Sequence, residues 1–166
     1  MSTMRMTRFQ LKGTDGGPLR GEVRTGGRRE QRPAVVICHG FKGFKDWGFF
    51  PVLADRLARA GMTAITFNFS GSGVGAEGDG FSEPDRFAHS TFSRDVSDIA
   101  IVCEALETGG LVDGLVKADG YGLFGHSRGG GAAVLHSAAK AAVRSLVTWA
   151  AISHVNRWDQ ATMQEW

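Results

Sequence analysis

The chain has 166 residues, of which 42% are hydrophobic and 22% are charged, and its formal net charge is +2. This length predicts one domain with a sizeable core. The near-neutral charge, without an aromatic or basic module that reads bases, excludes nucleic acid as an expected partner. The longest apolar runs are too short to cross a bilayer, so we expect no membrane partner and a cytoplasmic location.

Two strand patterns open the chain and are followed by a strand and a helix. Residues 6–12 and 19–25 predict an antiparallel hairpin around a turn rich in Gly, Asp and Pro. The continuous apolar run 34–38 predicts a central parallel strand that is covered on both faces. Asp46 stands where it would cap a helix over 47–60.

The rest of the chain continues the alternation of strands and helices. The predicted elements are, in order, strand 62–69, loop 70–90, helix 93–108, strand 119–124, helix 127–142 and strand 144–150. Such an alternation predicts right-handed crossovers between parallel strands. The expected fold is therefore α/β, with a mostly parallel sheet, helices on both faces and an antiparallel hairpin at its N-terminal side.

The segment Gly125-His126-Ser127-Arg128-Gly129 follows an apolar strand pattern and precedes a helical pattern of small residues. In that context, G-x-S-x-G predicts a nucleophile elbow, a sharp turn between strand and helix that presents the serine hydroxyl. The two glycines have a steric reason, because such a turn is strained and packs closely against neighbouring backbone. The motif predicts covalent catalysis by serine.

Other polar and glycine-rich segments follow the remaining predicted parallel strands. They are His39-Gly40-Phe41, the run 70–73 and Ser153-His154. The carboxyl ends of parallel strands meet at one edge of a sheet, where ligands of such folds bind. We therefore expect these segments to share one crevice with Ser127.

The hairpin, His39-Gly40, the glycine-rich run and the Ser127 elbow, in that order, resemble the α/β-hydrolase superfamily. The segment His39-Gly40-Phe41-Lys42-Gly43-Phe44-Lys45-Asp46-Trp47 looks like the serine esterase and dienelactone-hydrolase-like branch, although serine rather than cysteine stands at the nucleophile position. The resemblance implies Ser127 as the nucleophile and the backbone N–H groups of Phe41 and Arg128 as oxyanion-hole donors, with both side chains incidental to that role. It also implies that the pocket and motif residues are His39, Gly40, Gly125, His126 and Gly129.

In this superfamily the acid and then the histidine follow the serine along the chain. Only 39 residues follow Ser127, which leaves room for one further strand but not for the two units that carry acid and base. The resemblance therefore implies that residues 1–166 are a single α/β-hydrolase domain that is incomplete at its C-terminal side. Within the chain, His154 with Asp159 is the one candidate base and acid pair, and a loop role is its alternative.

The expected function is hydrolysis of an ester, thioester or related acyl bond through an acyl-enzyme, with a small acyl molecule as substrate and little activity from this chain alone. The alternative is a non-catalytic module that binds a small acyl ligand or a protein partner. No metal is expected, and no cofactor, because the glycine run 71–76 lacks the helix that would receive a pyrophosphate. An exposed edge strand over 144–150 predicts self-association.

Overall fold

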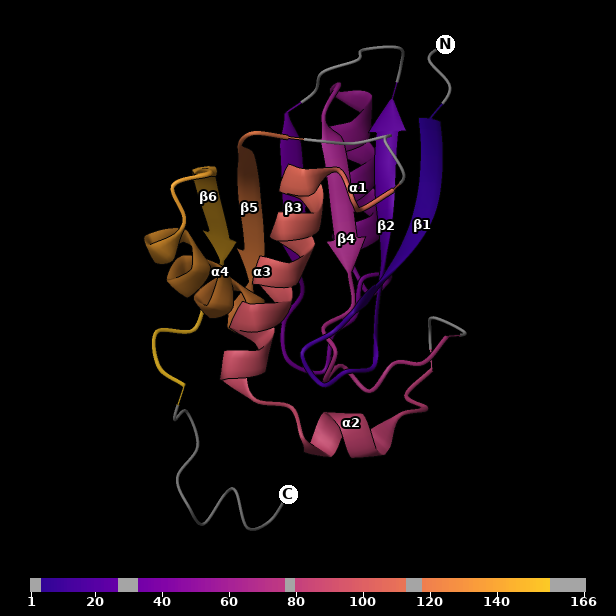
Figure 1. Cartoon of the computed structure of the whole chain (residues 1–166), viewed down its shortest axis with the longest axis vertical. Coiled ribbons are helices and arrows are strands. Elements are labelled where there is room, and N and C mark those ends of the chain that lie inside the picture. Colours follow the sequence, from indigo (N-terminus) through magenta and orange to yellow (C-terminus); the bar gives the residue numbers. More distant parts are fainter. Residues whose placement is uncertain (1–3, 27–32, 77–79, 113–117, 156–166) are drawn as a thin grey trace.

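Six strands form one mixed sheet (Figure 1) in a computed structural model that describes residues 4–26, 33–76, 80–112 and 118–155. The strands, in their order across the sheet, are β1 (Met4–Lys12), β2 (Pro18–Gly26), β4 (Thr63–Phe67), β3 (Ala34–Cys38), β5 (Tyr121–His126) and β6 (Val143–Trp149). β1 and β2 form the predicted hairpin, and β2 pairs antiparallel with β4. The strands from β4 to β6 are parallel, which confirms the predicted α/β architecture.

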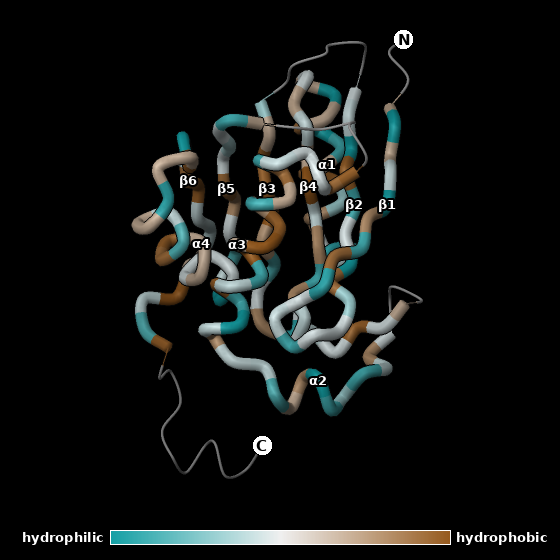
Figure 2. Tube along the Cα trace, in the orientation of Figure 1, coloured by the Kyte–Doolittle hydropathy of each residue, from teal (hydrophilic) through white to brown (hydrophobic). Residues whose placement is uncertain are grey.

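Helices cover both faces of this sheet. α1 (Phe50–Arg59) packs on one face, and α3 (Phe92–Thr108) and α4 (Ser127–Ala139) pack on the other (Figure 1). Because side chains alternate along a strand, Ile37 joins Phe50 and Ala54 on the α1 side, while Val36 joins the larger core under α3 and α4. Figure 2 shows hydrophobic residues along the central strands β3 and β4.

The first helix begins later than its sequence pattern predicts. α1 starts at Phe50, its N-cap Phe49 makes no side-chain capping bond, and Pro51 lies in the first turn. Proline suits that position because its missing N–H would have no partner within the helix. The predicted cap Asp46 is instead held by Lys45, whose Nζ lies 2.5 Å from its carboxylate. The predicted start at residue 47 is therefore wrong.

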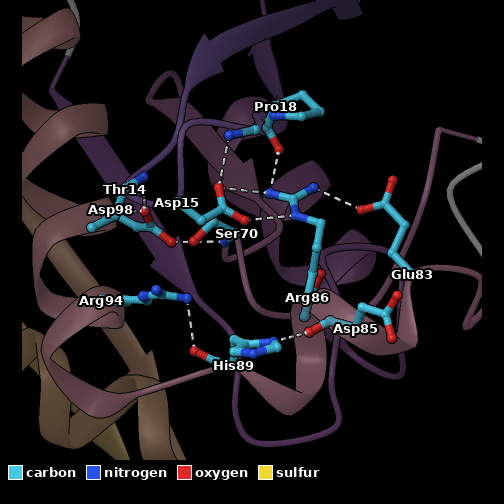
Figure 3. A network of polar contacts seen from close by, with 12 residues as sticks. Thr14, Asp15, Pro18, Ser70, Glu83, Asp85, Arg86, His89, Arg94 and Asp98 are labelled. Atoms are coloured by element: carbon cyan, nitrogen blue, oxygen red, sulfur yellow. Dashed lines mark hydrogen bonds and ion pairs between the residues drawn. The ribbon is translucent and has the colours of Figure 1, made fainter.

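The predicted loop 70–90 contains a short helix, α2 (Pro84–Ala88), which lies beyond the carboxyl ends of the strands (Figure 1). Figure 3 shows its anchor: Arg86 Nε donates to Asp15 Oδ2 at 2.7 Å, and Nη1 donates to Glu83 Oε2 at 2.6 Å. Asp98 of α3 holds the same hairpin turn by accepting from the Thr14 N–H at 3.1 Å. Asp15 lies 71 residues from Arg86, so this contact, which holds the helix in place, leaves no local pattern that predicts it.

The two edges of the sheet differ in their side chains. β1 carries basic residues along its length, which is a common protection of an edge strand. β6 exposes Leu146, Val147 and Trp149, whose exposed fractions are 37%, 56% and 57%. Self-association through this edge stays a prediction. Within the described residues, no helix is both long and apolar enough to span a membrane.

Candidate active site

The carboxyl ends of β3, β4 and β5 bring three predicted site segments to one edge of the sheet. His39 and Gly40 follow β3, the run 70–73 comes after β4, and Ser127 follows β5 directly. The segment 39–43 lines a small pocket at this edge. Its other walls come from residues after β4, from α2 and the loop after it, and from the first turns of α3 and α4: Phe69, Gly71, Ser72, Phe87, Ser90, Asp95 and Arg128. Three of the four predicted segments therefore meet at this edge, whereas Ser153 and His154 line a different pocket.

Ser127 lies at a sharp turn between β5 and α4. Its φ is +53°, in the left-handed region, whereas His126 before it is extended with φ −107° and ψ 133°. A residue other than glycine adopts a positive φ only at a cost, and such residues gather at functional sites. The Ser127 carbonyl accepts the Ile152 N–H at 3.1 Å, so the segment after β6 helps to hold the turn. This backbone is the strand-to-helix turn that the motif predicts.

Close backbone contacts explain the glycines of the motif. A Cβ on Gly129 would lie 2.1 Å from the His39 carbonyl oxygen, and a Cβ on Gly125 would lie 2.5 Å from Gly130 Cα. A Cβ on Gly40 would lie 3.0 Å from Ser127 Cβ. The first two contacts leave no room for a side chain, and the third places the segment after β3 against the serine.

His39 is a structural bridge between the ends of two strands. Its Nδ1 donates to the Gly40 carbonyl at 2.9 Å, and its Nε2 accepts the Phe69 N–H at 3.1 Å. Burial lowers the pKa of His39 to about 4, and the nearby Arg128 charge acts in the same direction. The ring is therefore neutral at physiological pH, and both of its nitrogens are occupied by backbone groups.

The other histidines of the motif and its surroundings do not reach Ser127. The His126 ring packs edge-on against Phe49 and Phe50, and its Nδ1 is buried without a hydrogen bond. His154 is exposed, and its Nδ1 lies 2.7 Å from Ser153 Oγ. In the described part of the chain, no histidine hydrogen-bonds to Ser127. Asp159, the predicted partner of His154, lies outside the described residues.

Arg128 makes side-chain contacts that the motif does not suggest. Its Nε lies 2.5 Å from Asp95 Oδ2, its Nη2 donates to Ser90 Oγ at 3.1 Å, and its guanidinium lies 5.6 Å from the centre of the Phe41 ring. Asp95 is buried in the first turn of α3, and burial raises its pKa to about 6, against the opposing effect of Arg128. The sequence offers one indication of Asp95: it stands four residues before Ile99 and therefore on the buried face of the helix.

The chain matches one family model and is similar to several solved structures. The family model described as serine aminopeptidase, S33, matches residues 29–166. A search of curated proteins finds no match. Among solved structures, dienelactone hydrolase from Anabaena variabilis is 19% identical with a TM-score of 0.67, over 90% of this chain and 64% of that one. Brefeldin A esterase, a bacterial homologue of human hormone sensitive lipase, is 21% identical with a TM-score of 0.63, over 98% and 44%.

The α/β hydrolase GrgF from Penicillium sp. is also similar, at 21% identity and a TM-score of 0.66, over 87% of this chain and 45% of that one. At these identities the structures share the fold, and the chain spans 44% to 64% of their length. The family match covers most of the sequence, including the elbow and the segment after β3. The chain therefore belongs to the serine aminopeptidase S33 family of α/β-hydrolases.

Proposed function

We propose that this chain carries the nucleophile and the oxyanion donors of a serine hydrolase that cleaves an ester, thioester or related acyl bond. One observation carries the proposal: Ser127, with a φ of +53°, lies at the carboxyl edge of the sheet against Gly40. A Cβ added to Gly40 would lie 3.0 Å from Ser127 Cβ. The strained turn leaves the serine at the helix start rather than within a regular helix.

In the proposed reaction, Ser127 Oγ attacks the acyl carbon while its proton passes to a general base. The carbonyl π bond opens, and the resulting oxyanion accepts hydrogen bonds from the backbone N–H groups of Phe41 and Arg128. The first amides of a helix have no partner within the helix, which suits the N–H of Arg128 to this task. One such donor typically lowers the barrier by about 3–4 kcal/mol. Collapse expels the leaving group, and water then hydrolyses the acyl-enzyme.

The general base and its orienting acid come, in this proposal, from outside the described residues. Serine is a weak nucleophile until a base within hydrogen-bond reach accepts its proton. His39 is occupied by two backbone groups, and His154 is exposed beside Ser153. We therefore expect the 166 residues alone to have little activity, with His154 and Asp159 as the pair to test within them.

The test compares the chain with Ser127→Ala in two assays. We expect p-nitrophenyl acetate hydrolysis by the chain to be no faster than by the variant. With added imidazole as an external base, a fluorophosphonate should label Ser127, detected by mass spectrometry of the peptides, and the variant should lose that label.

Labelling that does not depend on Ser127 would contradict the nucleophile role. Ser127-dependent turnover without imidazole would instead place the base within the chain, and His154→Ala would then identify it. If neither assay depends on Ser127, and an acyl compound still binds the chain, the non-catalytic module is the better description.

A further inference from the structure

We propose that the Arg128 side chain, anchored by Asp95, holds the two oxyanion-donor residues in place, so that Asp95 and Arg128 are positioning residues. The inference rests on the proposed function, because it takes the N–H groups of Phe41 and Arg128 as the donors. It gives the side chains of Asp95 and Arg128 a role in addition to that of the backbone N–H donors.

Two polar side chains hold the guanidinium of Arg128. Asp95 accepts from its Nε at 2.5 Å and Ser90 Oγ accepts from its Nη2 at 3.1 Å, so two edges of the group are fixed. Its carbon lies 5.6 Å from the centre of the Phe41 ring, within the range of a cation–π contact. The planar fork of arginine allows these contacts together, whereas the point charge of lysine does not. One side chain thus joins both donor residues.

The segment of Phe41 and Lys42 carries the other backbone donor. Phe41 also stacks on Phe87 of α2, with ring centres 5.5 Å apart. The next residue, Lys42, has a φ of +57°, a conformation that costs energy and persists only where the surroundings hold it. Phe41 is 40% exposed, so solvent-facing packing alone gives it limited support. The contacts of Phe41 with Arg128 and Phe87 help to hold this strained segment, beside the turn that the Gly43 N–H closes on the Gly40 carbonyl at 3.1 Å.

Asp95 is buried and has few charged neighbours. Its side chain is 5% exposed, and Arg128 is the one cation that forms an ion pair with it among the described residues. Arg128 approaches it from α4 and Asp98 from its own helix, and Cys38 at the end of β3 interacts with it electrostatically. The neutral His39 lines the same pocket. A buried carboxylate with one counter-charge orients that charge strongly, because leaving either unpaired is costly.

The experiment uses Asp95→Asn and Arg128→Gln, each of which keeps the backbone donors. The matched control is Glu22→Gln, a buried carboxylate that pairs with Lys45 and Arg24 at a site linked to α1. One readout is the fluorophosphonate reaction of Ser127 with imidazole, separated into the saturating rate and the half-saturating concentration. The other is the order parameter of the Phe41 amide from nitrogen-15 relaxation, which needs no activity.

We expect both variants to lower the saturating rate by about 10²-fold, the effect of a misplacement of about 1 Å, without changing the half-saturating concentration. The Phe41 amide should fall from a rigid order parameter of about 0.85 toward about 0.6. The double variant should be no slower than the slower single one, since the two side chains act as a unit. Arg128→Lys, which keeps the charge and supports folding, should be intermediate. The control should match the wild type in both readouts.

The ionisation of Asp95 adds a signature that a purely structural role would not show. The charged carboxylate anchors Arg128, and the pKa of Asp95 is about 6. The ratio of the wild-type rate to the Asp95→Asn rate should therefore shrink as the pH falls below about 6. A constant ratio would contradict the role of the charge.

An unchanged saturating rate and an unchanged Phe41 order parameter in both variants would overturn the inference. If Ser127→Ala still abolishes labelling in that case, the proposed function stands and only the positioning role falls. If labelling does not depend on Ser127, the proposed function falls, and the order parameter alone decides whether Arg128 holds the Phe41 segment.

Discussion

The elbow around Ser127 and the anchor of α2 are held by different kinds of contact. At the elbow, backbone atoms meet backbone atoms, and a Cβ on Gly129 would lie 2.1 Å from a carbonyl oxygen. At the anchor, Arg86 and Asp98 bind the hairpin turn through charged side chains (Figure 3). A backbone contact has no way to relax, whereas an ion pair has adjustable side chains. The elbow is therefore fixed by close backbone packing, whereas α2 is fixed by charged side chains.

The largest expected effect is that of Gly129→Ala. The new methyl group would meet the carbonyl oxygens of His39 and Cys38, which belong to the backbone at the end of β3 and cannot rotate away. We expect the free energy of unfolding to fall by about 3 kcal/mol or more, as in an overpacked core. Urea denaturation measures the change.

Gly110→Ala is the matched control, because the nearest atom to its new Cβ would be a side-chain oxygen at 3.6 Å. It should change the free energy of unfolding by less than about 0.5 kcal/mol. Equal effects of the two substitutions would show that close backbone contact is not what fixes the elbow.

The next effect concerns the pH dependence of stability at the elbow. Burial raises the pKa of Asp95 from 3.8 to about 6. The folded state therefore binds this proton more tightly, and the associated stability is complete below pH 3.8 and is lost as the pH rises through about 6. This loss amounts to about 3 kcal/mol. The folded protein thus carries a destabilising charge beside the proposed oxyanion donors.

Asp95→Asn removes that titration. The stability of the variant minus that of the wild type should rise by about 3 kcal/mol between pH 3 and pH 7. Denaturation at a series of pH values measures this difference, in which groups common to both proteins, such as His39, cancel. A flat or falling difference would contradict the raised pKa of Asp95.

A smaller effect is expected from Asp98→Asn, on the anchor side of the same helix. Asp98 Oδ2 accepts the Ser70 N–H at 2.7 Å, and Oδ1 accepts the Thr14 hydroxyl at 2.6 Å. The amide nitrogen of asparagine is itself a donor, so it cannot accept a hydrogen bond from the Ser70 N–H or the Thr14 hydroxyl. One of these buried donors would therefore be left without a partner. We expect a loss of about 2 kcal/mol in the free energy of unfolding. A loss below about 0.5 kcal/mol would mean that Asp98 does not anchor the turn.

The smallest effect is that of Arg86→Gln, which removes the ion pairs of α2 with Asp15 and Glu83. These side chains are partly exposed, so we expect a loss of about 1 kcal/mol. The loss should shrink in 1 M NaCl because salt screens such pairs, whereas the Gly129→Ala effect should not. Arg94→Gln, which loses one exposed bond to the His89 carbonyl, is the control and should have little effect. A salt-independent loss at Arg86 would contradict the electrostatic anchor.

Much of the fold follows from local pattern. Alternating strands and helices predicted the parallel sheet, and a turn signal predicted the hairpin, because periodicity records which faces are buried. The helix boundary at Phe50 and the short helix α2 were outside that reach. A five-residue helix has too few hydrogen bonds to form by itself, and Arg86 reaches a turn 71 residues away to hold it.

The sequence by itself determined the strained turn at Ser127, because the motif G-x-S-x-G stands between a strand pattern and a helical pattern. Only the tertiary structure decided that Asp95 would face Arg128, since that contact joins two helices 33 residues apart along the chain. The same holds for His39, whose ring bridges two strands and is neutral because it is buried. The pattern that predicts a turn lies in residues close together in the sequence, whereas the pairing and burial of charges, like the backbone contact between Gly129 and His39, depend on which distant elements meet.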